Sequence, residues 1–194
     1  MAHNLNYNER TGKYSFFSVQ QKAWHNLGQI IEQYPTSAEA IKYAGLDFEV
    51  IKSPLYTRGT GISISNDGEI KEGGNILLPD NFATMRTDTN TVFGVVGKDY
   101  QIVQNADAFA FFDAIVGGDD GILYETAGAL GNGERIFITA KLPDYIRVGN
   151  GDDITEKYIF LTTSHDGTGS ITAAFTPVRV VCQNTLNAAL GNMS

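Results

Sequence analysis

The sequence feature that most constrains the fold is a short turn, Gly131-Asn-Gly133, between two segments with the pattern of β-strands. After the turn, residues 135–142 alternate between polar and apolar side chains, as in a strand with one face on a core. Residues 123–130 precede it, and the glycines supply the backbone freedom of a tight hairpin. A phosphate-binding loop would instead need a lysine and a helix after its last glycine. The turn therefore predicts an antiparallel hairpin.

A second hairpin is predicted around Asp166-Gly-Thr-Gly169, between strands at residues 158–163 and 170–176. A strand is also predicted at residues 48–57, where Pro54 favours a sheet edge or a bulge. The other predicted elements are short strands at residues 16–19, 62–64, 85–86, 91–96 and 100–103, loops at residues 73–74 and 79–81, and a loosely held N-terminal segment of about fifteen residues.

Three helices are predicted. Thr36 and Glu39 form a capping box for a helix over residues 36–45. A second helix, over residues 105–117, has an apolar stripe on one face, and Asn105 is placed to cap it. Residues 185–190 also have a helical pattern. We therefore predict an α+β fold with a mainly antiparallel, bent sheet and a few packed helices.

Length and composition indicate a single α+β domain over residues 1–194. The last predicted helix begins just before the sequence stops, so we expect a C-terminal portion to be missing. One cysteine allows no internal disulfide, and no secretory signal or membrane-spanning run is visible, so we expect a cytoplasmic protein without a membrane partner. The net charge of −8, with no basic residue between Lys98 and Arg135, disfavours duplex DNA as a partner.

Candidate chemistry is sparse. His165 and Asp166 are adjacent and could supply an acid and a base, but neighbouring residues of an extended chain point apart, so a turn is the better interpretation. Cys182 could be a nucleophile, but it lies in an apolar run typical of a buried cysteine. Three histidines and one cysteine lack the spacing of a zinc site. We expect no metal and no cofactor.

Two further residues are candidates for ligand binding. Trp24, beside His25, could stack on a base, although a single tryptophan more often fills a core. Arg179 lies between two valines and could hold a phosphate or a carboxylate ligand. An ion pair with one of the chain's 22 acidic residues is the interpretation that we favour for this arginine.

Three segments together resemble a phage- and plasmid-associated family of unknown function, domain of unknown function 932. They are Ala23-Trp-His-Asn-Leu-Gly28, Tyr100–Asn105 leading into the predicted helix, and Ser164–Gly167 continuing to Thr176–Leu186. The resemblance implies a protein of mobile genetic elements and carries no catalytic residues. The candidates for a ligand or nucleic-acid site that it suggests are Trp24, His25, His165, Asp166, Arg179 and Asn184.

Three hypotheses follow. The first is a non-enzymatic accessory factor in mobile-element DNA metabolism, which binds single-stranded nucleic acid or acts in recombination. The second is a self-assembling module that forms a homo-oligomer through its sheet. The third, which we favour least, is an enzyme whose pocket is built from His165, Asp166, Arg179 and Cys182.

Overall fold

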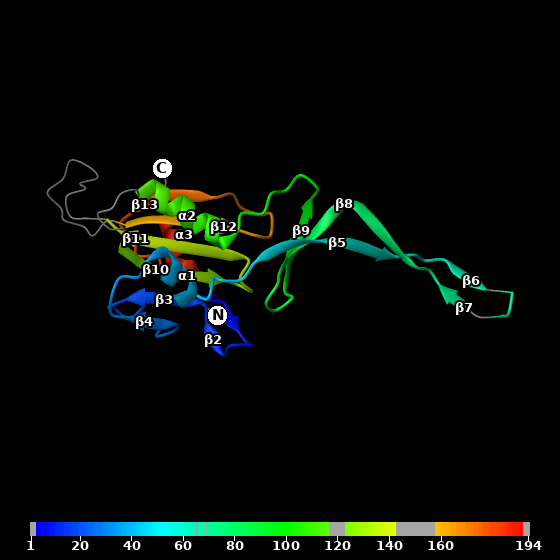
Figure 1. Cartoon of the computed structure of the whole chain (residues 1–194), viewed down its shortest axis with the longest axis horizontal. Helices are drawn as coiled ribbons and strands as arrows, with labels where there is room; N and C mark the ends of the chain where they lie inside the picture. The colour runs from blue at the N-terminus through cyan, green and yellow to red at the C-terminus, as the bar shows by residue number, and fades with distance from the viewer. Residues whose placement is uncertain (1–2, 65, 69, 117–122, 143–157, 192–194) are drawn as a thin grey trace.

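The computed structural model describes residues 3–64, 66–68, 70–116, 123–142 and 158–191. A six-stranded sheet forms the body of the molecule, and a long β-arm projects from it (Figure 1). The fold is α+β and mainly antiparallel, as the sequence predicts. The elements in chain order are β1 (Tyr7–Asn8), β2 (Lys13–Tyr14), β3 (Phe16–Val19), β4 (Gln29–Ile31), α1 (Ser37–Tyr43), β5 (Val50–Arg58), β6 (Ile62–Ile64), β7 (Ile70–Glu72), β8 (Asn75–Arg86), β9 (Val92–Gly97), α2 (Asn105–Val116), β10 (Leu123–Leu130), β11 (Arg135–Lys141), β12 (Tyr158–Ser164), β13 (Thr172–Thr176) and α3 (Gln183–Gly191).

The two predicted hairpins supply four adjacent strands of the body sheet, whose strand order is β13-β12-β11-β10-β3-β4. Leu130 and Arg135 are opposite each other across the first turn, where Gly131 and Gly133 have φ angles of +64° and +107°. A Cβ on Gly133 would lie 2.6 Å from an Nη of Arg86, so glycine is also required there by the close approach of that side chain. The turn chemistry therefore fixes the register of the central strands.

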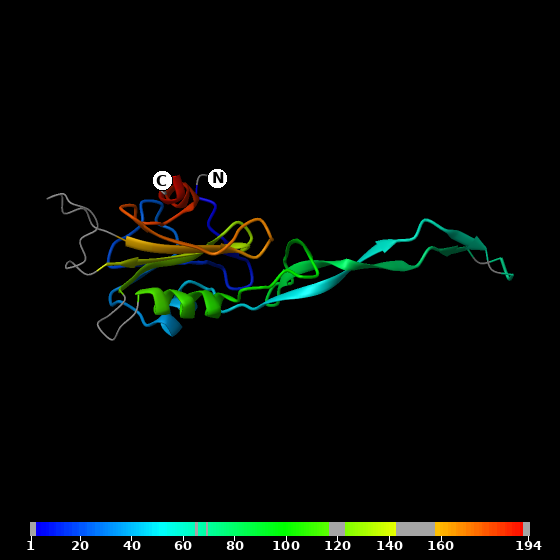
Figure 2. The same ribbon diagram turned by 90° about the horizontal axis from the view of Figure 1, so that it is seen from above.

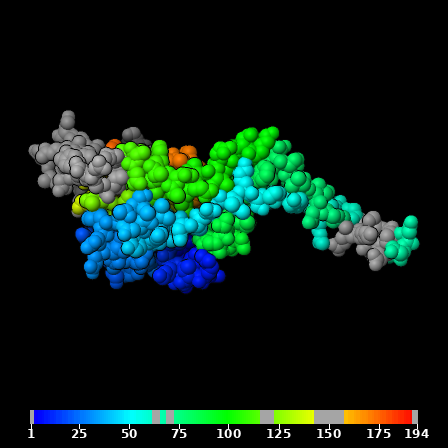
Figure 3. All heavy atoms as spheres, in the orientation of Figure 1, coloured from blue at the N-terminus to red at the C-terminus, as the bar shows by residue number. Residues whose placement is uncertain are grey.

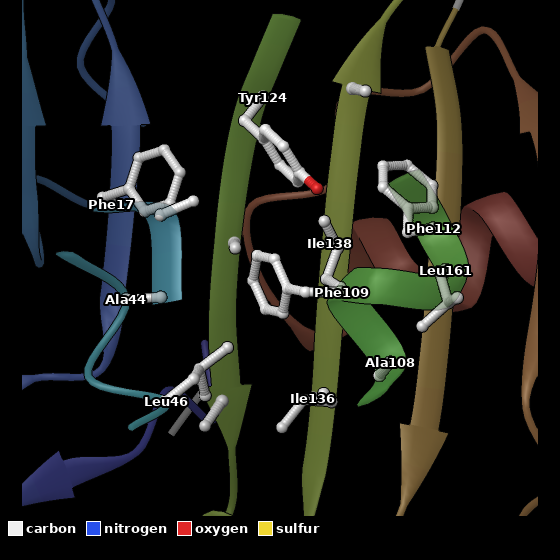
Figure 4. Packing of buried hydrophobic residues seen from close by; sticks show 14 of the residues in the cluster. Phe17, Ala44, Leu46, Ala108, Phe109, Phe112, Tyr124, Ile136, Ile138 and Leu161 are labelled. Atoms are coloured by element: carbon white, nitrogen blue, oxygen red, sulfur yellow. The ribbon is translucent and has the colours of Figure 1, made fainter. Parts of the chain in front are cut away.

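Helices cover both faces of the body sheet, as Figure 2 shows: α1 and α2 lie on one side and α3 on the other. On the first side, Phe109 and Phe112 of α2 pack on Tyr124 and Ile138 of the sheet (Figure 4). On the other side, α3 covers a second cluster that includes Phe137. Both faces of the central strands are consequently buried, which explains their high apolar content.

The helices begin for different reasons. The predicted capping box is present in α1, where Thr36 accepts from the backbone N–H of Glu39 and the Glu39 carboxylate accepts from that of Thr36. Asn105 opens α2, but its side chain does not act as the predicted cap. Its amide donates instead to the carbonyl oxygen of Leu46 at 3.0 Å and accepts from His165, so it ties three separate segments together.

The N-terminal segment is more ordered than predicted. β1 and β2 form a small hairpin, and Asn6 and Ser15 are buried, with the Ser15 hydroxyl donating to the Asn6 side chain at 3.0 Å. The next strand, β3, pairs in parallel with β4, a three-residue strand that the sequence analysis missed. β3 confirms the strand predicted at residues 16–19, whereas β4 has only three residues, too few for a periodic signal, so its pairing with β3 determines it.

The arm is built from β5, β8 and β9, with β6 and β7 at its far end, and projects well beyond the body (Figure 3). Residues 79–81, predicted as a loop, lie inside β8 as a bulge opposite Pro54, because Phe82 pairs with Pro54 and Leu78 with Leu55. The edge or bulge predicted for Pro54 is therefore confirmed. Residues 100–103, predicted as a strand, have no regular structure.

Side-chain contacts hold the base of the arm to the body. The side chain of Gln104 makes the two hydrogen bonds that a neighbouring strand would make with the backbone of Val50. Its amide oxygen accepts from the Val50 N–H at 3.0 Å, and its amide nitrogen donates to the Val50 carbonyl oxygen at 2.8 Å. Phe93 of β9 stacks on His165 with a centroid distance of 5.9 Å. Within the part of the chain that the structure describes, no helix is long and apolar enough to cross a membrane.

Candidate functional site

Trp24 and His25 lie in a turn that contacts the start of α3. The N–H of Leu27 donates to His25 Nδ1 at 3.0 Å, so Nε2 carries the proton and donates to the carbonyl oxygen of Val181 at 3.0 Å. Burial lowers the pKa of His25, which keeps this arrangement neutral. Trp24 is 61% exposed and meets His3 edge-on. His25 therefore joins two of the family-like segments, whereas Trp24 does not fill a core.

His165 and Asp166 lie at the base of the arm. The His165 ring is buried, stacked on Phe93, and its Nε2 lies 2.8 Å from the side-chain oxygen of Asn105. Burial lowers the pKa of His165 to about 4; the charge of Asp166 opposes this shift, and the charge of Arg86 acts in the same direction as burial. The ring is therefore neutral at physiological pH and inaccessible to a substrate.

The side chain of Asp166 stabilises the turn that follows it. Its Oδ1 accepts hydrogen bonds from the backbone N–H and the hydroxyl of Thr168 at 2.9 and 2.7 Å. Burial raises the pKa of this carboxyl, but the hydrogen bonds from Thr168 outweigh it and leave the pKa below the usual value. This is the geometry of an Asx turn, which matches the turn favoured from the sequence.

Arg179 forms the ion pair with an acid that the sequence analysis favoured. One guanidinium nitrogen lies 2.7 Å from Oε1 of Glu125, and the same nitrogen donates to the carbonyl oxygen of Val19 at 3.2 Å. Both side chains are largely buried. The arginine thus links the segment before α3 to β10 and β3.

Cys182 and Asn184 flank the beginning of α3. Cys182 is fully buried in the cluster beneath that helix, whereas Asn184 is exposed. His165 belongs to a different cluster at the base of the arm, on the opposite side of the sheet. The four residues of the hypothetical enzyme pocket are therefore held in separate sets of contacts, and the structure does not bring them together.

A groove of about 750 Å³ lies between the β1–β2 hairpin, β4 and the C-terminal end of α1; we call it the N-terminal groove. Its lining comes from four stretches of the chain, within residues 8–15, 28–29 and 42–47 and at Asp88. This site was not predicted from the sequence, because its four stretches are far apart in the chain and each carries only a weak signal by itself. A volume of this size is typical of small-ligand sites.

Three cations and two tyrosines line the N-terminal groove: Arg10, Lys13, Lys42, Tyr14 and Tyr43. All five side chains are exposed. A sequence signal existed, since a lysine followed by a tyrosine occurs both at 13–14 and at 42–43, and basic residues interleaved with aromatic ones are typical of nucleic-acid surfaces. The two pairs are far apart in the sequence, and only the fold makes them neighbours.

The tyrosine rings of the groove are supported from one side. Tyr14 pairs with Tyr7 across the β1–β2 hairpin, with ring centroids 5.1 Å apart. Tyr43 meets the buried ring of Phe17 edge-on at 6.3 Å, and the side-chain amide of Gln29 donates to its carbonyl oxygen. These contacts fix the rings in place while 36% of Tyr14 and 39% of Tyr43 stay accessible to a ligand.

The wall of the groove depends on Gly28, the last residue of the Ala23–Gly28 segment. Its φ angle is +78°, and a Cβ there would lie 2.5 Å from the carbonyl oxygen of Phe16. A side chain at this position would be both strained and in collision with β3. Gly28 therefore has a structural role in placing β4 beside the groove.

The groove is locally basic in an acidic protein. It contains two carboxylates, Asp47 and Asp88. The buried guanidinium of Arg86 donates to both oxygens of Asp88, at 2.7 and 2.8 Å, and these hydrogen bonds lower the pKa of Asp88, with a further contribution from the charge of Arg10. Since Asp88 is neutralised by Arg86, three cations face a single unpartnered carboxylate in the lining.

The residues that the structure describes contain no group of three or more His, Cys, Asp or Glu side chains placed to hold a metal ion. The charged groups of the N-terminal groove are mostly cations, so its chemistry suits an anionic ligand rather than a metal. The tyrosines add flat apolar surface beside those cations. The arrangement fits a ligand that carries both negative charge and a planar ring.

No curated protein and no solved structure matches this chain. A family model, described as domain of unknown function (DUF932), matches residues 92–194, from β9 through α3. The matched part includes His165, Asp166 and Arg179, whereas Trp24, His25 and the whole lining of the N-terminal groove precede it. Because this match covers more than half of the sequence, the protein belongs to the DUF932 family, whose function is unknown.

Proposed function

We propose that this protein binds single-stranded nucleic acid in the N-terminal groove, as a non-enzymatic accessory factor in the DNA metabolism of a mobile genetic element. The observation that carries the proposal is the meeting of Arg10, Lys13 and Lys42 with Tyr14 and Tyr43 in one groove. Cations along a strand neutralise phosphates, and aromatic rings stack on unpaired bases.

The geometry favours a single strand over a duplex. The bases of a duplex are stacked inside it and cannot reach Tyr14 or Tyr43, whereas those of a single strand can. The surface outside the groove is acidic in sum, with a net charge of −8 for the chain, so an extended duplex meets repulsion beyond the groove. A short stretch of single strand needs contact with the basic lining alone.

The burial of the candidate catalytic side chains also favours a binding role over catalysis. The ring of His165 and the thiol of Cys182 are buried in separate clusters. Neither group faces the N-terminal groove, whose titratable lining consists of cations, tyrosines and two aspartates.

The experiment is fluorescence anisotropy of a labelled single-stranded oligonucleotide and of its duplex, with free mononucleotide as a competitor. Three phosphate contacts predict that the logarithm of the binding constant falls with the logarithm of salt concentration with a slope of roughly −2. The variant Lys13→Glu/Lys42→Glu should lose at least about ten-fold in affinity. The matched control, Lys22→Glu/Lys98→Glu, has the same charge change at exposed positions outside the groove and should bind like the wild type.

Three results would contradict the proposal. These are no binding at low salt, equal loss in both double variants, and a preference for the duplex. Displacement of the strand by mononucleotide at comparable concentrations would instead identify a nucleotide site, because a strand that occupies several contacts competes far better than one nucleotide.

A further inference from the structure

Asp47 is a negative charge in a groove whose other free charges are positive. The second carboxylate of the lining, Asp88, is bound by Arg86, whereas no group among the residues that the structure describes binds the carboxylate of Asp47. The side chain of Asp47 is exposed. A free carboxylate repels the phosphates of a strand, so it weakens binding unless the ligand also brings hydrogen-bond donors to it.

The core holds the backbone on both sides of Asp47. Leu46 and Phe48 are buried, so the side chain of Asp47 extends from the opposite side of the chain. The Asn105 amide donates to the carbonyl oxygen of Leu46 at 3.0 Å, and the N–H of Leu46 donates to the carbonyl oxygen of Ile41 at 2.9 Å. A ligand in the groove therefore meets a carboxylate whose point of attachment is already fixed.

The short stretch that contains Asp47 supplies three different groups to the groove. Lys42 and Tyr43 are the last residues of α1, and Gly45, with a φ angle of +64°, turns the chain at the end of the helix. The ring of Tyr43 is a stacking surface, the ammonium of Lys42 suits a phosphate, and the carboxylate of Asp47 accepts hydrogen bonds. These are the groups that recognise the ring, the phosphate and the edge of one unpaired nucleotide.

The four bases offer different edges to a carboxylate. Guanine alone has two adjacent donors on its pairing edge, the ring N1–H and the exocyclic amino group, which match the two carboxylate oxygens. Adenine and cytosine have one amino group beside a ring nitrogen that accepts, and thymine has one N–H between two carbonyl oxygens. In a duplex the two guanine donors are bound to cytosine, so only an unpaired guanine can use them.

We propose that the N-terminal groove selects guanine, with the base stacked on Tyr43 and its pairing edge bound to Asp47. This inference rests on the proposed function and names the base that the same site prefers. Asp47 stabilises a bound guanine and repels the backbone of a strand without one. A bidentate pair of this kind discriminates between bases by about ten-fold or more.

The test is fluorescence anisotropy of four thymine oligonucleotides that differ at one central position. That position carries guanine, hypoxanthine, adenine or thymine. The guanine strand should bind at least about ten-fold more tightly than the thymine strand. Hypoxanthine lacks only the amino group of guanine and should give an intermediate affinity. Adenine is the control for stacking, because it is a purine without the donor pair, and it should bind well below guanine.

The variant Asp47→Asn separates recognition of the base from electrostatics. Loss of a negative charge alone would strengthen the binding of all four strands equally. The proposal predicts instead that the preference for guanine falls to within about two-fold, because only the guanine strand loses a charge-assisted pair. Glu49→Gln is the matched control and should keep the preference, since Glu49 is exposed two residues further along the chain and lies outside the lining.

The outcomes separate this inference from the proposed function. Equal binding of the four strands, or an unchanged preference for guanine in Asp47→Asn, would overturn the inference while strand binding stands. No binding of any strand would overturn both. Free guanine mononucleotide that competes as well as the guanine strand, with adenine mononucleotide ineffective, would support guanine recognition and contradict a strand as the ligand.

Discussion

The stability of this protein should depend on pH through His165. The ring is buried, and its Nε2 must donate to the side-chain oxygen of Asn105, because the amide nitrogen of Asn105 already donates to Leu46. A neutral imidazole with one N–H satisfies this arrangement. Protonation would place a charge in an apolar environment, and the cost of burying that charge outweighs the attraction of Asp166, while the positive charge of Arg86 adds to the cost.

The magnitude follows from the two pKa values of His165. In the unfolded chain the imidazole titrates near 6.5, and in the folded protein burial lowers the pKa to about 4. Between these two pH values the imidazole is protonated in the unfolded chain but not in the folded protein. The contribution of His165 to the free energy of unfolding is therefore fully present above about pH 6.5 and decreases as the pH falls toward 4. The difference between 6.5 and about 4, at about 1.4 kcal/mol per pH unit, gives a loss of about 3 kcal/mol.

The assay is urea unfolding at about pH 7 and about pH 4, for the wild type and for His165→Gln. Glutamine keeps an N–H donor for Asn105 and does not titrate, so this variant should lose about 3 kcal/mol less than the wild type over the same interval. Acid-labile carboxylates such as Asp88 affect both proteins alike. Equal losses in the two proteins would refute the reasoning, because His165 would then not be held neutral.

Three further predictions concern residues of the family-like segments. Gly28→Ala should lower the free energy of unfolding by about 2 kcal/mol or more, measured by urea unfolding, because of the positive φ angle and the collision with Phe16; an unchanged midpoint would show that β4 can move away. Arg179→Gln should cost about 3 kcal/mol by removing the cation 2.7 Å from the buried Glu125 carboxylate, and the double variant Glu125→Gln/Arg179→Gln should recover part of this loss; no recovery would contradict an ion-pair role. Cys182 should not react with a thiol reagent in the native protein and should react once the chain is unfolded in urea; fast native labelling would contradict its burial.

The central part of the fold was predictable from the sequence because its signals are local. The glycine turn at 131–133 fixes one hairpin by backbone conformation, and the capping box at Thr36 fixes the start of α1. Both signals depend on residues within a few positions of one another. The same holds for the apolar stripe of α2, whose Phe109 and Phe112 pack on the sheet as its periodicity implies.

The rest depends on contacts between distant residues. β3 and β4 pair in parallel through three residues each, too few for a periodic pattern. The arm was not predicted as one long hairpin, because Pro79 and Asp80 are residues typical of loops. In the structure these two residues lie in the bulge of β8, and the strand continues on both sides of it. Asn105 resembles a helix cap in sequence, but the neighbouring Leu46 carbonyl and His165 ring, both distant in sequence, use its side chain instead.

In the candidate site, too, the residues that stand out in the sequence differ from those that the fold brings together. The distinctive residues of the sequence, His25, His165, Asp166 and Arg179, form internal hydrogen bonds or ion pairs that hold segments together. The residues that line the N-terminal groove are ordinary lysines, tyrosines and an arginine, and their proximity is created by the fold. A distinctive sequence position therefore indicates a packing requirement here more often than a binding role.

The most direct test of the central claim is to locate the bound strand. A single-stranded oligonucleotide that contains a photoreactive pyrimidine would be bound to the wild-type protein, irradiated, and the cross-linked peptides identified by mass spectrometry. The account predicts cross-links at Tyr14 and Tyr43, because a base stacked on either ring lies in direct contact with it. Cross-links concentrated at Trp24, with none in the N-terminal groove, would contradict it.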